Sequence, residues 1–98
     1  MKLGQFVKSP VERKRYALDY TDWLDTGETI TGVTFTVAPS TGTSPLVVDS
    51  SSISTSGTEV RFFVASGDDG GNYTVTAVIQ TSGGQIKEDE IIYLVRNL

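Results

Sequence analysis

The chain has 98 residues and a formal net charge of −4, and it contains neither cysteine nor histidine. It therefore has no disulfide, no thiol nucleophile and no imidazole, the commonest general base and metal ligand. The length is that of one domain, and no apolar run approaches the ~20 residues that a membrane crossing needs. Composition thus excludes cysteine- and histidine-dependent catalysis and predicts one domain without a membrane partner.

Charge is divided unevenly along the chain. Residues 1–15 carry five basic side chains and one acidic side chain, whereas the rest carries three basic and eleven acidic ones. A basic segment before an acidic body is typical of an arm that docks on an acidic surface. We predict a basic N-terminal arm over residues 1–14, disordered alone or ordered on a partner, and a sandwich domain over residues 15–98. The acidic body would repel phosphates, so an acidic protein or a neighbouring copy is the expected partner rather than nucleic acid.

Alternation of apolar and polar residues with a period of two predicts the strands. Between them, residues 21–28 predict a single helical turn, capped by Thr21 or Asp22, that places Trp23 over the core. Gly32 indicates a bulge, and residues 82–84 a hairpin turn. Residues 50–57, rich in serine, are expected to be mostly connection. The predicted strands cover residues 15–20, 29–38, 46–49, 58–65, 73–81 and 85–96.

The segment from Asp69 to Thr81 indicates the fold class. After a glycine-rich turn, Tyr73, Val75, Ala77 and Ile79 share one face. In immunoglobulin-like sandwiches a tyrosine at this place ties a corner by bonding its hydroxyl to the backbone. Short strands, regular turns and no convincing helix predict an all-β, immunoglobulin-like antiparallel β-sandwich of about seven strands with an extended N-terminal arm.

The candidate partner-binding residues lie mainly in the basic segment. Phe6 and Val7 are its adjacent apolar pair, and its cations suit an acidic partner. Phe63 falls on the outer face of its strand, where an aromatic side chain marks a contact surface or a place that the arm covers. The candidates are Phe6, Val7, Lys8, Arg13, Lys14, Arg15 and Phe63.

No motif carries catalytic or metal chemistry. The acidic residues at 68–69 and 88–90 lack the spacing of a calcium loop and are expected to be solvated, those at 88–90 as charges that protect a strand end. The serines have no basic partner, and a domain of this size has little room for the cleft that two glycosidase carboxylates require. We predict no enzyme, no cofactor and no metal site.

Several segments follow the pattern of one family. They are residues 8–10, 16–24, 28–37, 71–76, 81–85 and 89–91. With them the chain resembles the small immunoglobulin-like proteins of tailed phages and prophages described as fiber–tail adaptor proteins. The resemblance covers nearly the whole chain from Lys8 on, and its most specific part runs from Asp19 to Ile30.

The resemblance implies a non-enzymatic virion structural protein, made in the host cytoplasm and present in several copies. Such a protein joins the tail to fibers or to neighbouring tail proteins, so its partners are other virion proteins. Two alternatives stay open from the residues. One is a capsid cement or decoration protein, and the other is a host-glycan-binding module that would expose Phe63 or Trp23.

Overall fold

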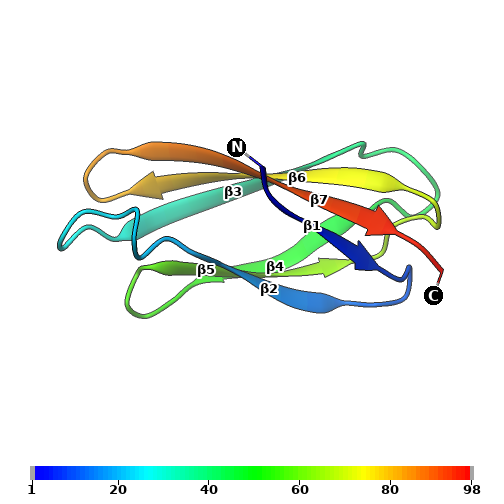
Figure 1. Ribbon diagram of the computed structural model, residues 1–98, viewed down its shortest axis with the longest axis horizontal. Helices are drawn as coiled ribbons and strands as arrows, with labels where there is room; N and C mark the ends of the chain where they lie inside the picture. The colour runs from blue at the N-terminus through cyan, green and yellow to red at the C-terminus, as the bar shows by residue number, and fades with distance from the viewer. Residues whose placement is uncertain (1, 98) are drawn as a thin grey trace.

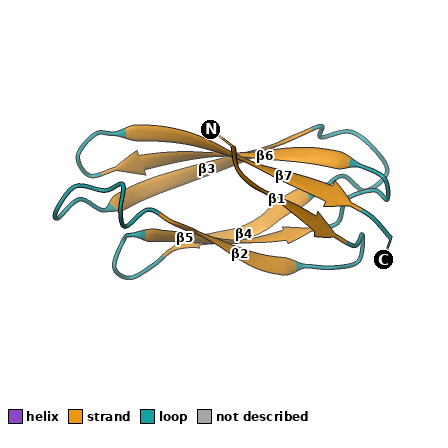
Figure 2. Cartoon of the chain, viewed as in Figure 1, coloured by secondary structure: helices purple, strands orange, loops and turns teal. Residues whose placement is uncertain are grey.

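The computed structural model describes residues 2–97, with side chains from residue 3, as two packed β-sheets joined by turns (Figures 1 and 2). None of the described elements is a helix, and so none has the length and apolarity that a membrane-spanning helix requires. The all-β prediction is confirmed. The strands are β1 (Lys2–Lys8), β2 (Lys14–Asp19), β3 (Ile30–Ala38), β4 (Val47–Ile53), β5 (Glu59–Ala65), β6 (Asn72–Thr81) and β7 (Ile86–Val95).

The two sheets hold four and three strands. The first sheet has the order β1-β7-β6-β3, and the second has the order β2-β5-β4. Neighbouring strands are antiparallel except for β1 and β7, which run parallel, so the expectation of a purely antiparallel sandwich is corrected. The molecule is elongated, at 43 × 20 × 18 Å. We call the end with the β2–β3, β4–β5 and β6–β7 connections the hairpin end, on the left in Figure 1, and the opposite one the C-terminal end.

The core lies between the sheets and is built from alternate residues of the central strands. The predicted inward faces of β5, β6 and β7 are confirmed, because their side chains are at most 3% exposed. Burial of this apolar surface drives the folding of a chain that has no disulfide. The buried residues of these faces are Val60, Phe62, Val64, Tyr73, Val75, Ala77, Ile79, Ile91, Tyr93 and Val95.

The N-terminal segment is a strand of the sandwich, so the expectation of an extended arm is wrong for the described residues. Strand β1 pairs with β7 from Lys2 to Lys8. The ring of Phe6 stacks on Tyr93 with centroids 5.7 Å apart and lies 4.9 Å from the ring of Tyr16. The side of β7 that β1 covers would otherwise be an open sheet edge. Pairing of the backbone and stacking of the rings together give the segment its order.

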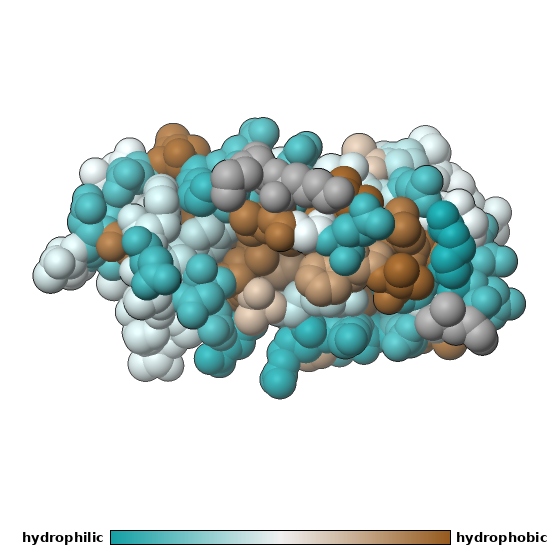
Figure 3. Space-filling view, in the orientation of Figure 1, coloured by the Kyte–Doolittle hydropathy of each residue, from teal (hydrophilic) through white to brown (hydrophobic). Residues whose placement is uncertain are grey.

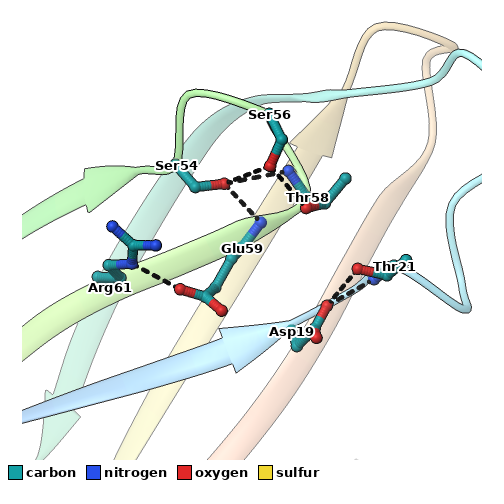
Figure 4. A network of polar contacts seen from close by, with 7 residues as sticks. All are labelled: Asp19, Thr21, Ser54, Ser56, Thr58, Glu59 and Arg61. Carbon is teal, nitrogen blue, oxygen red and sulfur yellow. Dashed lines mark hydrogen bonds and ion pairs between the residues drawn. The ribbon is translucent and has the colours of Figure 1, made fainter.

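The serine-rich segment after β4 also differs from the expectation. Strand β4 continues through Ile53 at the edge of the second sheet, with a bulge between Val48 and Ser50. Only the turn from Ser54 to Thr58 is connection. There the hydroxyl of Ser54 accepts hydrogen bonds from the backbone amides of Thr58 and Glu59, as Figure 4 shows. The hydroxyl of Ser54 therefore stabilises the hairpin turn, because it accepts from backbone amides that have no partner in the strand pairing.

The β2–β3 connection forms the predicted single turn. The amides of Trp23 and Leu24 both donate to the carbonyl of Tyr20, at 3.0 Å each. The cap comes from Asp19, two residues before Thr21, rather than from Thr21 or Asp22 as expected, since the carboxylate of Asp19 accepts from the amide and the hydroxyl of Thr21. Trp23 is half-buried against the core, as expected. The register also shifts between Ile30 and Gly32, so the predicted bulge is confirmed.

Tyr73 ties the turn between β5 and β6. Its hydroxyl accepts a hydrogen bond of 2.9 Å from the backbone amide of Asp68, five residues earlier. This is the corner bond expected from the sequence. Tyr93, by contrast, buries its hydroxyl without a hydrogen-bond partner in the described chain.

These two tyrosines predict opposite effects of the same change. We expect Tyr73→Phe to lower the free energy of unfolding by about 1–3 kcal/mol, because the amide of Asp68 loses its acceptor. Tyr93→Phe removes a buried hydroxyl that bonds to nothing, so it is expected to leave stability unchanged or to raise it. Urea denaturation of both variants measures the difference. Equal losses in the two variants would contradict the role of the corner bond.

Candidate partner-binding surface

Three of the candidate residues meet on the outer face of the second sheet. Arg15 of β2 lies directly opposite Phe63 of β5. The guanidinium of Arg13 lies 3.9 Å from the centre of the Phe63 ring, and its Nε donates to Asp49 at 2.7 Å. A guanidinium over an aromatic face is attracted by the negative electrostatic potential that the ring quadrupole places on that face. We call Arg13, Arg15 and Phe63 the arginine platform.

Part of the hydrogen-bonding capacity of the arginine platform is not used within the described residues. In residues 2–97, the terminal nitrogens of Arg13 make no hydrogen bond, and the guanidinium of Arg15 makes neither a hydrogen bond nor an ion pair. The bond with Asp49 raises the pKa of Arg13, so its charge persists at any working pH. Planar guanidinium groups with open edges suit carboxylates, which they bind with two parallel bonds.

Two further candidates flank the open side of the sandwich that β1 crosses. Phe6 and Val7 are 42% and 55% exposed, and Leu3 beside them is 40% exposed. Val7 aligns with Leu94 on the outer face of the first sheet, whereas Phe6 aligns with Tyr93 and leans toward the core. In Figure 3, brown apolar surface gathers midway along this side of the molecule. An apolar strip at a sheet edge is a typical contact surface.

The remaining two candidates, Lys8 and Lys14, do not join the arginine platform. Lys8 is only 1% exposed, and its ammonium donates to the carbonyls of Ser9 and Ser66. Burial lowers the pKa of Lys8, and the nearby Glu12 acts in the opposite direction. Lys8 therefore ties β1 to the β5–β6 turn from inside. Lys14 lies opposite Val64, with its ammonium 5.9 Å from the centre of the Tyr16 ring.

A shallow hollow of about 340 Å³ at the hairpin end is organised by Glu28. Its carboxylate accepts hydrogen bonds from the hydroxyl of Thr81 and from the amide group of Gln85. These bonds, the one from Thr81 first, hold the pKa of Glu28 below its ordinary value of 4.5. The carboxylate thus joins the β2–β3 turn to the β6–β7 hairpin, and its oxygens are used in hydrogen bonds within the fold.

The hydrogen bonds of Glu28 predict a pH dependence of stability. A carboxylate whose pKa is lower in the folded than in the unfolded chain stabilises the fold above its ordinary pKa. That contribution disappears as the pH falls below 4.5 and through the lowered value. We expect Glu28→Gln to melt at a lower temperature than the parent chain at pH 7. The difference between the two melting temperatures is expected to shrink as the pH falls from 5 to 3. A difference in melting temperature that stays constant over this range would contradict the coupling between stability and protonation of Glu28.

Besides Lys8, sequence reasoning missed the burial of Asp89, which was expected to be solvated at a strand end. Strand β7 is internal to its sheet, and Asp89 faces the core with 0% exposure. The hydroxyl of Tyr20 donates to its Oδ2 at 2.8 Å. The ammonium of Lys87 lies 3.1 Å from its Oδ1 as an ion-pair partner, although that oxygen has no aligned hydrogen bond. One signal was available in the sequence: Asp89 falls on the same face of its strand as Ile91 and Tyr93, which were predicted to be core residues.

The described residues contain no group of three or more acidic side chains that could hold a metal ion. Trp23 packs on Tyr20 with ring centres 5.8 Å apart, and Phe63 lies beneath Arg13. Fold and surface together define a class of protein: a small two-sheet β-sandwich with a basic and aromatic patch on one face and an apolar strip along one edge.

Comparison with protein families places the chain within this class. Residues 8–93 match the family model described as "Podophage GP4 fiber-tail adaptor protein gp77". The match covers most of the chain, so the chain belongs to this family of phage fiber-tail adaptor proteins. It is a structural component of the phage tail, not an enzyme. No curated protein matches the sequence at a significant level.

Proposed function

We propose that this chain joins the phage tail to its fibers or to neighbouring tail proteins through the arginine platform and the adjoining apolar strip of β1. The observation that carries the proposal is the meeting of Arg13, Arg15 and Phe63 on one outer face, with guanidinium edges that the chain does not use. Aromatic and arginine side chains are the types that dominate binding energy at protein interfaces.

The two parts of this surface have complementary roles. Leu3, Phe6 and Val7 supply apolar area on an edge strand, where a partner removes it from water. The arginine platform supplies charge and direction, which set the orientation of the partner and the rate of encounter. Membership of the adaptor family supports virion proteins as the partners, and we propose that several copies act together.

Binding of purified tail and fiber proteins of the same phage, measured by biolayer interferometry, tests the proposal. We expect Phe63→Ala and Arg15→Ala each to weaken binding to at least one of these proteins about tenfold, a typical effect of truncating an interface hot spot. Ile86→Ala is the matched control, since Ile86 is 69% exposed at the hairpin end. Unchanged affinity in both platform variants would refute the proposal.

We also propose that the sandwich has immunoglobulin-type connectivity. The order β2-β5-β4 corresponds to strands B, E and D of that fold, and the order β7-β6-β3 corresponds to G, F and C. The corner bond of Tyr73 lies at the start of the strand that corresponds to F. On this assignment β1 is a first strand that joins the sheet of β7.

A further inference from the structure

The charges of the chain are separated along its long axis. Among the side chains that the structure describes, the half nearer the hairpin end has eight acidic and two basic ones, a formal charge of −6. The half nearer the C-terminal end has five basic and four acidic side chains, a formal charge of +1. The first group is Asp19, Asp22, Asp25, Glu28, Glu59, Glu88, Asp89, Glu90, Arg61 and Lys87. The second is Lys8, Arg13, Lys14, Arg15, Arg96, Glu12, Asp49, Asp68 and Asp69.

Two carboxylates lie at the tip of the acidic half. Asp22 and Asp25 are exposed on the β2–β3 turn. Within residues 2–97, the side chains of both make no hydrogen bond or ion pair. The neighbours of Asp22 have structural roles, since Asp19 caps the turn and Trp23 packs on the core. The side chains of Asp22 and Asp25 therefore have no partner among the described residues, although the backbone of Asp25 bonds to Glu28.

The arginine platform, in the other half of the molecule, carries the opposite charge to these carboxylates. Arg15 and the terminal nitrogens of Arg13 have open donors on the outer sheet face, where Arg15 lies opposite Phe63 and Arg13 covers the Phe63 ring. Open guanidinium forks bind carboxylates. Because donors and acceptors lie in opposite halves of one elongated chain, they cannot meet within one copy, but they can meet between two copies.

We infer that the Asp22–Asp25 turn of one copy docks on the arginine platform of a second copy. The contact is heterologous, with different surfaces on the two partners, so each copy keeps one free turn and one free platform for further copies. Opposite charges steer the encounter, and like charges oppose the alternative in which two hairpin ends meet. This inference rests on the proposed function, because it names a second copy as the occupant of the same platform.

Charge reversal on each side tests the contact. The measurement is sedimentation equilibrium of the full chain, in about 50 mM and about 500 mM salt. We expect the parent chain to associate, and to associate less at high salt, where such charges are screened. Arg15→Glu alone and Asp22→Arg/Asp25→Arg alone are each expected to weaken association about tenfold or more. Lys14→Glu is the matched control, since it makes the same charge change beside the platform.

A mixture of the two reversed variants gives the decisive result. Each variant repels its own kind, but the glutamate of one faces the arginines of the other, and the unchanged platform and turn still match. We expect the 1:1 mixture to recover association. A parent chain that stays monomeric, or a mixture that fails to recover, would overturn the inference. If Arg15→Glu abolishes binding to fiber or tail proteins but leaves self-association unchanged, the second copy is wrong as occupant while the proposed function stands.

Discussion

Phe62→Ala is expected to lower the free energy of unfolding by about 3–5 kcal/mol, the usual cost of emptying a buried phenylalanine site. Phe62 is 1% exposed at the centre of the sandwich. Its ring lies 4.8 Å from Phe35 of the opposite sheet and 5.9 Å from Tyr16 of its own sheet. The variant loses the transfer free energy of the ring and leaves a cavity between two sheets that cannot close over it.

The adjacent residue provides a matched control. Phe63 is the same residue type one position later, on the outer face of β5. Phe63→Ala loses only a half-exposed ring and its contact with Arg13, so we expect a change of about 1 kcal/mol or less. Urea denaturation of both variants tests the contrast. The measured losses would contradict this account of the core if Phe62→Ala cost no more than Phe63→Ala.

Lys87→Met is expected to produce the second large effect, a loss of about 2–3 kcal/mol. The substitution keeps an unbranched side chain only one atom shorter but removes the only cation beside buried Asp89 in the described chain. Removing one partner of a buried ion pair typically costs about 3–5 kcal/mol, because the other charge stays desolvated. Lys87 keeps 22% of its side chain exposed, so solvent already screens part of the pair.

A second variant separates charge from packing. In Lys87→Met/Asp89→Asn the uncompensated charge is absent, and the asparagine oxygen can still accept from Tyr20. We expect the double variant to recover at least half of the stability that Lys87→Met loses, as measured by urea denaturation. A double variant less stable than Lys87→Met would show that the carboxylate itself, and not its lost partner, supports this end of the core.

The contrast of Phe62 and Phe63 shows how much of the fold could be predicted from the sequence. A strand exposes alternate residues on opposite faces, so the order of residues alone separates the inner ring from the outer one. The same reasoning found the inner faces of β6 and β7, the bulge at Gly32 and the corner bond of Tyr73. These features depend on neighbours in the chain and on the local chemistry of glycine and tyrosine.

The N-terminal strand could not be predicted in this way. Residues 2–8 contain a glycine and do not alternate, and the segment begins and ends with lysine. Its order comes from the ladder with β7, from the rings of Tyr16 and Tyr93, and from carbonyls that receive the Lys8 ammonium. Of these partners, Tyr16 and the carbonyl of Ser9 are near in the chain, whereas β7 and the carbonyl of Ser66 lie more than 50 residues away.

The features of the candidate surface also fall into two groups, those predictable from the sequence and those set by the tertiary structure. By itself the sequence determined the strand periodicity, the outward position of Phe63, the cations before β2 and the absence of histidine and cysteine chemistry, because each follows from residue type and local spacing. Only the tertiary structure decided that Arg13 covers Phe63, that Lys8 is buried and that Asp89 is a core residue. These outcomes depend on which strands become neighbours, and long-range burial and charge pairing set that choice.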